Sequence, residues 1–278
     1  MPAIALALCA SLAWGASDFL AGVQSRRVSV LTVLVVSQAL GLAAMLPVAV
    51  AFGGALPEAR AVAWAAGAGV AEVIGFAALY RGLATGAMSL IAPLGATAGV
   101  VPVIVGLAGG QQLGAVQWAG VALALSGVAL AATESGAAAG VRLAAGCALA
   151  LLAALAFGTF FVAMDQAADG GVLWATVINR WASLTVLAAA LAVARTRPRM
   201  PDGAAAPIAA VGTLDIGANA LFAAALAQGL GGVVSVLGSL YPVTTVVLAQ
   251  VVLHERVRRL QRVGVTTALA GVALLSLA

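Results

Sequence analysis

An internal duplication constrains the fold of this chain more than any other feature of its sequence. Residues 117–130 and 261–274 agree at nine positions when the two stretches are aligned at an offset of 144 residues. Two further landmarks recur at an offset of 143, namely Trp14-Gly15 with Phe157-Gly158 and Glu72-Val73 with Asp215-Ile216. The chain therefore contains two copies of one unit.

The composition predicts a membrane protein. The 278 residues are 64% apolar and 8% charged, whereas soluble domains are roughly 45–50% apolar and about 25% charged. All thirteen basic residues are arginine, and in a membrane protein such residues mostly report orientation, so we expect no nucleic-acid partner. Cys9 and Cys147 fall in apolar stretches, and with a single histidine the chain offers no expected metal site or other cofactor site.

Apolar runs of about 20 residues, the length that crosses the hydrocarbon layer, predict an all-α membrane protein with ten transmembrane helices. We expect a first repeat at residues 1–135, a short linker at 136–141 and a second repeat at 142–278. Because five spans per repeat is an odd number, the second copy enters the bilayer from the opposite side, and the repeats are predicted to be inverted around a central cavity. The expected spans are 3–22, 30–52, 61–83, 87–108, 114–133, 142–164, 172–194, 205–229, 232–253 and 261–277.

Ionisable residues inside spans are expected to face a cavity or a partner, because a charge at the bilayer centre costs at least about 2.5–3.5 kcal/mol. Glu72 and Asp215 occupy equivalent positions near the middle of their spans, and a helix-to-helix hydrogen bond is the structural alternative for both. Arg180 is the arginine placed well inside a span; it is expected either to pair with a carboxylate or substrate, or to extend toward the outer interface. The sequence allows at most one of the two carboxylates a close arginine partner, so we expect one to stay ionised and the other to exchange protons.

Other residues share helical faces with these groups or with each other. Trp14 and Asp18 lie one turn apart, although interfacial anchoring and helix-end placement are the alternatives. Prolines inside spans favour kinks, which could act as gates or be static bends. The predicted substrate-binding or pathway residues are Trp14, Asp18, Glu72, Phe76, Tyr80, Phe157, Arg180, Asp215, Asn219, Ser235, Ser239 and Tyr241, and the predicted gating residues are Pro93, Pro102 and Pro242.

Several motifs resemble the EamA branch of the drug/metabolite transporter superfamily. They are residues 235–242, the Leu253-His254-Glu255 run, Gln261 with Gly264, residues 270–274 and Trp14-Gly15. The first half departs from the family pattern, because Gly109-Gly110-Gln111 stands where the family usually repeats Leu-Gly-Glu. Glu255 adjoins a basic loop, where a solvated salt bridge is expected. The arginine distribution favours external termini, whereas the family habit implies cytoplasmic ones.

The resemblance implies a secondary transporter of the bacterial inner membrane, with multiple spans, that exports small polar metabolites and most plausibly amino acids. Alternating access to a midplane cavity is the expected mechanism. A drug or nucleotide-sugar-like exporter is the alternative, and a membrane-embedded enzyme or scaffold is the alternative from another class. We expect no enzymatic activity. The expected partners are a small-molecule substrate, with proton coupling open, and the lipid bilayer, around a monomer or weak homo-oligomer.

Overall fold

The computed structural model describes residues 2–86, 88–110, 114–131, 137–168, 170–226, 237–238, 240–256 and 259–276, and within these ranges the regular structure is helical, with no strand. Six described helices contain an apolar stretch long enough to cross a membrane. They are α1 (Pro2–Gln24), α2 (Val30–Phe52), α3 (Ala59–Thr85), α7 (Ala137–Ala168), α8 (Val172–Val193) and α9 (Ala205–Leu226).

The remaining described helices are shorter and also contain apolar stretches. In the first half they are α4 (Met88–Gly95), the 3₁₀ helix η1 (Ala96–Gly99), α5 (Val100–Ala108) and α6 (Ala115–Ala131). In the second half they are α11 (Tyr241–Val252) and α12 (Arg259–Ser276). The number of long and short apolar helices indicates a multi-pass membrane protein. Helices suit this environment because they satisfy their own backbone hydrogen bonds in lipid.

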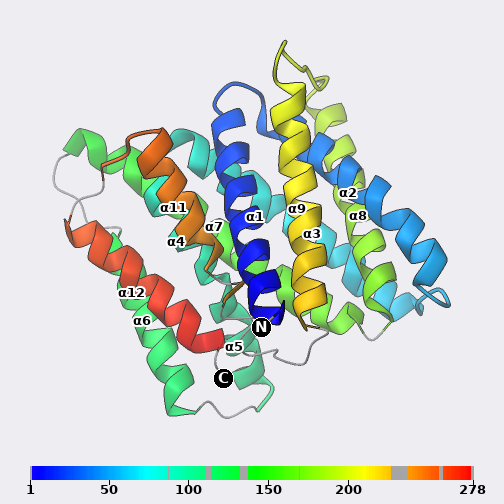
Figure 1. Cartoon of the computed structure of the whole chain (residues 1–278), viewed down its shortest axis with the longest axis horizontal. Coiled ribbons are helices and arrows are strands. Elements are labelled where there is room, and N and C mark those ends of the chain that lie inside the picture. Colours follow the sequence, from blue (N-terminus) through cyan, green and yellow to red (C-terminus); the bar gives the residue numbers. More distant parts are fainter. Residues whose placement is uncertain are drawn as a thin grey trace.

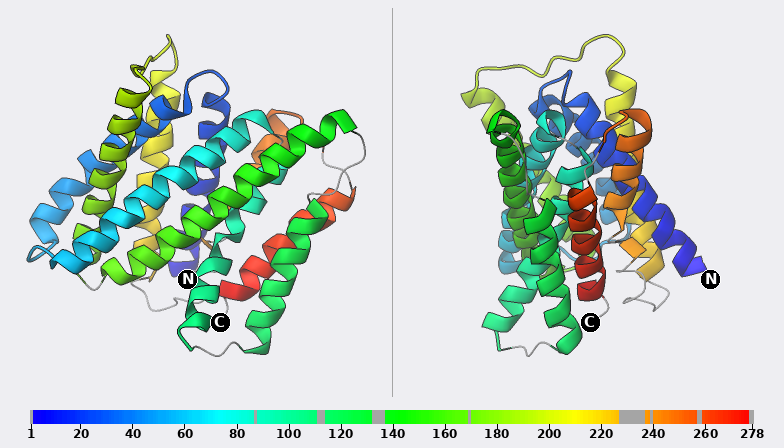
Figure 2. Two further views of the ribbon diagram at one scale, coloured as in Figure 1. Left: turned by 180° about the vertical axis from the view of Figure 1, so that it is seen from behind. Right: turned by 90° about the vertical axis from the view of Figure 1, so that its left-hand side faces the viewer.

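The two halves of the chain interlock instead of forming separate bundles. Helix α3 packs along α7, α1 along α9, α2 along α8 and α6 along α12, so each of these contacts joins the first half to the second. The rear view in Figure 2 shows α3 and α7 running side by side in opposite directions, with the α6 and α12 pair at one side of the molecule. The centre of the molecule therefore receives side chains from both halves.

The α6–α12 contact uses the repeated sequence motif twice. A Cβ added at Gly127 would lie 2.2 Å from the backbone nitrogen of Ala268, and one added at Gly271 would lie 2.2 Å from that of Ala124. Gly264 and Gly120 supply the next neighbours in the two cases. Small residues four apart let helix backbones approach closely in lipid. The same residues thus make the same contacts with the halves exchanged, and the two helices run antiparallel.

A second contact repeats in the same exchanged way. A Cβ at Gly15 of α1 would lie 2.3 Å from the carbonyl oxygen of Tyr241 and 2.4 Å from Thr244 Cβ on α11. A Cβ at Gly158 of α7 would lie 2.3 Å from Val101 Cβ on α5. Val101 and Thr244 are 143 residues apart, as are the two glycines, so the contact partners correspond just as the glycines do.

The fourth predicted span, residues 87–108, is not one continuous helix. Pro93 lies inside α4, Pro102 lies in the first turn of α5, and η1 separates the two helices. A proline removes one backbone hydrogen bond and crowds the turn before it, which accounts for an interruption between the two. The α-helical pattern is therefore interrupted by the 3₁₀ turn η1 between Pro93 and Pro102, and the kink and its gating role stay predictions.

Another expectation was wrong. Pro242 was expected inside a helix at 232–253, but within the described residues it lies in the first turn of α11, where its missing N–H removes no hydrogen bond of that helix. It therefore begins α11. Residues 137–141, which belong to the predicted linker at 136–141, are helical and form the first turns of α7. The division of the chain into two repeats stays a prediction.

Candidate functional site

Arg180 lies at the centre of a buried polar network. Its Nη1 atom is 3.3 Å from Oε1 of Glu72 on α3 and also donates to Oε1 of Gln38 on α2. Its Nη2 atom donates to Oδ2 of Asp215 on α9 at 3.0 Å. Gly41 of α2 leaves room for the guanidinium, since an added Cβ there would lie 3.3 Å from Arg180 Nε. One side chain on α8 thus joins three other helices.

Glu72 is the more firmly held of the two carboxylates. Its Oε2 atom accepts a hydrogen bond from Ser183 Oγ at 2.8 Å, and Ser183 also approaches the carbonyl oxygen of Gly69 at 3.1 Å. The Glu72 side chain is 5% exposed, whereas that of Asp215 is 20% exposed. Gly69 permits this close packing of α3 on α8, because a Cβ there would lie 2.5 Å from a backbone oxygen of α8. Asp215 is therefore the less buried member of the pair.

Asp18 of α1 adds a third carboxylate to this region. It is buried and lies close enough to Asp215 and Tyr241 to interact with them electrostatically. Within the described part of the chain its carboxylate has no hydrogen bond or ion pair. Three carboxylates and one guanidinium leave a formal charge of −2 when all four groups are ionised, which is costly away from water.

Two groups of aromatic rings contain residues one helical turn from Asp18 or Glu72. In the first group the Trp14 ring is 5.1 Å from Phe222 of α9 and 6.4 Å from Tyr241 of α11, measured between ring centroids. In the second group the Phe76 ring is 5.0 Å from Phe157 of α7 and 5.3 Å from Tyr80. Centroid separations of 4.5–7 Å are those of packed aromatic pairs. The rings predicted from the sequence thus form two packed groups, and the first group also contains Phe222.

The structure corrects two sequence expectations about Arg180. It does not extend toward an interface, since it is buried with ion pairs on two sides. It also contacts both Glu72 and Asp215, although at most one was expected to have a close arginine partner. A guanidinium has two terminal nitrogens with donors pointing in different directions, so a single arginine can serve two carboxylates.

The other predicted pathway residues differ in whether they lie near the Arg180 network. Asn219 is exposed, and its amide donates to the backbone oxygen of Asp215 on its own helix at 2.7 Å, so it does not join the network. Trp14 contacts other aromatic rings, and Asp18 is buried six residues before α1 ends, which excludes the helix-end placement. Ser235 and Ser239 lie outside the described residues. Participation of the nominated residues in transport stays a prediction.

Sequence reasoning missed two members of the network, Gln38 and Ser183. Both bond directly to its charged groups. A signal was available, because Gln38 is a polar residue near the middle of an apolar span. Ser183 lies three residues after Arg180, on the same face of α8. A search for every amide and hydroxyl one turn from an intramembrane charge would have found Ser183.

Glu255 ties three segments together at one end of the bundle. Its Oε1 atom accepts a hydrogen bond from the backbone nitrogen of Met88, the first residue of α4, at 3.0 Å. The same atom is 3.6 Å from Nη2 of Arg26, which also donates to the carbonyl oxygen of Leu83. A carboxylate at a helix N-terminus is favourable. Glu255 therefore has a salt bridge with Arg26, in the turn after α1.

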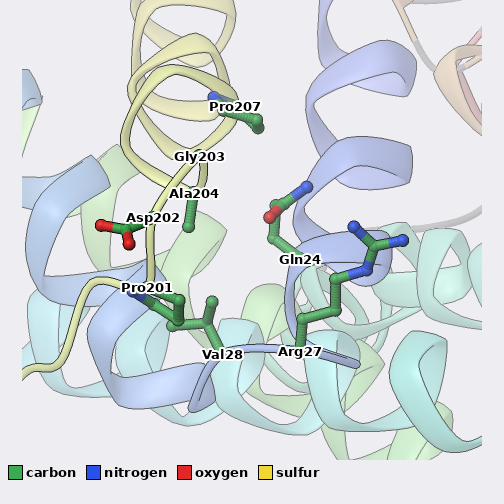
Figure 3. A pocket seen from close by; sticks show the side chains of 8 residues that line it. All are labelled: Gln24, Arg27, Val28, Pro201, Asp202, Gly203, Ala204 and Pro207. Carbon is green, nitrogen blue, oxygen red and sulfur yellow. The ribbon is translucent and has the colours of Figure 1, made fainter.

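A cavity of about 200 Å³ lies at an end of the bundle and not at the ion-pair network. Figure 3 shows it between the end of α1 and the turn that leads into α9, with Gln24 and Arg27 on one side and Ala204 and Pro207 on the other. The described cavity is thus separate from the midplane cavity that the sequence predicts, and the midplane cavity stays a prediction.

The helical bundle and its buried ion-pair network are typical of one class of protein. Apolar helices that enclose a partly reachable ion-pair network fit a multi-pass membrane protein that handles solutes, because intramembrane charges mark solute or ion pathways. Residues 1–133 and 144–277 each match the model of the EamA-like transporter family. The chain therefore belongs to this family, and the resemblance within the drug/metabolite transporter superfamily is confirmed.

Solved structures share the fold. A structure described as "Crystal structure of protein" is 17% identical in sequence, with a TM-score of 0.64. The alignment covers 98% of this chain and 95% of that chain. At this identity the likeness shows the fold alone. No curated protein matches the chain.

Proposed function

We propose that the protein is a secondary transporter that exports small polar metabolites, with amino acids as the first class to test, by alternating access to the region around Arg180. The observation that supports this most is the composition of the network. Its side chains come from α2 and α3 in the first half and from α8 and α9 in the second. A movement of one half against the other would change the distances between these charges, which is how such a site can couple binding to exposure.

We further propose ten spans in two inverted repeats, at residues 1–135 and 142–278, in a bacterial inner membrane. Six long and four shorter apolar helices of the described chain are consistent with ten crossings. Helices α1 and α7, the first of each half, run in opposite directions (Figures 1 and 2). The contact at Gly127 recurs at Gly271 with the halves exchanged, and the contact at Gly15 recurs in the same way at Gly158. Both repetitions support a two-fold relation between the halves.

Within this proposal the two carboxylates have different tasks. Glu72 holds Arg180 in place, because Ser183 of α8 and Gln38 of α2 support the Glu72–Arg180 pair. Asp215, with its more exposed side chain, separates from Arg180 during the cycle and exchanges protons or contacts the substrate. This assigns the fixed and the exchanging role, which the sequence left open between them.

Exchange assays in proteoliposomes test the proposal. Vesicles loaded with an unlabelled amino acid should accumulate the same labelled amino acid, and a panel of the twenty identifies the substrates. Asp215→Asn should reduce exchange at least tenfold, whereas Asp202→Asn, in an exposed loop, should leave it unchanged. Protein that is folded by size-exclusion chromatography but exchanges no member of a panel of amino acids, amines, sugars and nucleotides would contradict the transport function.

A further inference from the structure

Asp18 is a buried carboxylate that the proposed Arg180 mechanism does not use. It is 8% exposed, and within the described residues no side chain or backbone group bonds to it. The position that corresponds to it in the second half, at an offset of 143, is Phe161, which is exposed. Asp18 is therefore not part of the duplicated packing scheme. An unpaired carboxylate in this environment is costly unless a cation or a proton accompanies it.

The groups around Asp18 suit a cation and not an anion. Trp14 lies one helical turn before it on α1, and its ring packs against Phe222 and Tyr241. These three rings are half-buried, so none of them is completely covered by the described residues. The faces of such rings attract ammonium groups within about 6 Å. A carboxylate beside aromatic rings is thus a combination that recognises a protonated amine.

Groups on neighbouring helices also favour a cation. Asp18 lies near Asp215 on α9, Tyr241 on α11 and Tyr80 on α3. Arg180, the cation of the network, already contacts two carboxylates. When its carboxylates are ionised, the region carries excess negative charge, which a bound cation would reduce and a bound anion would increase.

We propose that Asp18, Trp14 and Tyr241 bind the protonated amine of a small organic cation that the transporter carries. The proposal rests on the transport function proposed above and narrows its substrate class to amines with a net positive charge. Asp18 supplies the counter-charge and hydrogen-bond acceptors, and the rings of Trp14 and Tyr241 cover the carbon atoms next to the nitrogen. Neutral and anionic solutes of the same length are excluded because they leave the Asp18 carboxylate unpaired.

Three five-carbon probes that differ in their end groups test this assignment with the full-length protein in detergent. Cadaverine carries two ammonium groups, 1,5-pentanediol two hydroxyls and glutarate two carboxylates. Binding measured by calorimetry should favour cadaverine at least tenfold over the other two. Asp18→Asn should weaken cadaverine binding about tenfold or more, as expected for the loss of a charged acceptor, and Trp14→Leu about threefold. Phe161→Leu, at the corresponding position in the other half, should leave binding unchanged.

Asp18→Glu is the control for a folding defect in Asp18→Asn. Because it keeps the charge, it should bind cadaverine within a few-fold of wild type even if Asp18→Asn is unstable. Equal cadaverine affinity in wild type and Asp18→Asn, or glutarate binding as tight as cadaverine binding, would overturn the proposal. Exchange of amino acids without any cadaverine binding would overturn it while leaving the transport function standing. Asp18-dependent cadaverine binding without exchange of any solute supports the site and contradicts the transport function instead.

Discussion

The α6–α12 pair and the Arg180 network show opposite relations to the sequence duplication. In the helix pair, a Cβ added at Gly127 or at Gly271 would lie 2.2 Å from the backbone nitrogen of corresponding residues, Ala268 and Ala124. In the network, Glu72 and Asp215 correspond to each other, but Arg180 corresponds to Ser37, whose hydroxyl donates to Leu34 O in its own helix. The glycine contacts therefore occur in both halves, whereas the charged centre contains a single arginine from the second half.

The difference follows from what each region requires. Close approach of two helix backbones depends on small residues at matching places, and both halves can supply them equally. In the proposed two-fold arrangement, a cation between two equivalent carboxylates lies near the axis that relates the halves, where a second guanidinium would compete for the same space and repel the first. One arginine therefore serves both halves, and the asymmetry gives the two carboxylates different surroundings.

Removing the shared cation should have the largest effect. Arg180→Met leaves Glu72 and Asp215 buried without a counter-charge, and the loss of one partner of a buried ion pair costs about 3–5 kcal/mol of unfolding free energy. We expect a large fall in melting temperature in detergent. The triple variant Arg180→Met, Glu72→Gln, Asp215→Asn should recover much of it, because no charge is left unpaired; a triple variant less stable than Arg180→Met would show that the charges are not the cause.

Neutralising the two carboxylates separately tests the asymmetry directly. Glu72→Gln should lower the unfolding free energy by about 3 kcal/mol, since Glu72 is buried with Ser183 and Arg180. Asp215→Asn should lower it by about 1 kcal/mol, because its side chain is more exposed. The order should reverse for solute exchange, where Asp215→Asn is the more damaging. Equal effects in both measurements would mean that the centre is functionally symmetric.

Enlarging the paired glycines tests the symmetric region. Gly127→Val and Gly271→Val should each cost about 1–3 kcal/mol, because the added Cβ meets a backbone atom that cannot move aside. The two melting temperatures should fall by similar amounts, since the neighbours correspond. Gly67→Ala, in open space on α3, serves as the control and should change little. A much larger effect at one of the paired glycines than at the other would break the equivalence of the two contacts.

The smallest expected effect concerns the support of Glu72. Ser183→Ala removes a hydrogen bond of 2.8 Å to a buried carboxylate and should cost about 1 kcal/mol. Thr185→Ala, two residues away, loses only a bond to its own helix and is the matched control. If the two variants melt at the same temperature, Ser183 does not support Glu72.

Sequence reasoning was most successful where a pattern repeats along the chain. Apolar run lengths located α2 and α8 to within a residue or so of their ends, because hydrophobic length is a local property. Partners in the network were harder to predict, since they depend on how α8 is rotated against α2 and α3. The double pairing of Arg180 is an example. The position of Pro242 was misjudged because a proline in an apolar run can either kink a helix or begin one.

The contacts of Gly127 and Gly271 also have an evolutionary consequence. A surface that meets a copy of itself through the same residues on both sides is the isologous interface of a two-fold homodimer. A protein of half this length could have formed the α6–α12 contact with a second copy of itself. Joining the two copies in one gene then freed the positions of Ser37 and Arg180, or of Asp18 and Phe161, to diverge. In a homodimer each such change would have appeared twice.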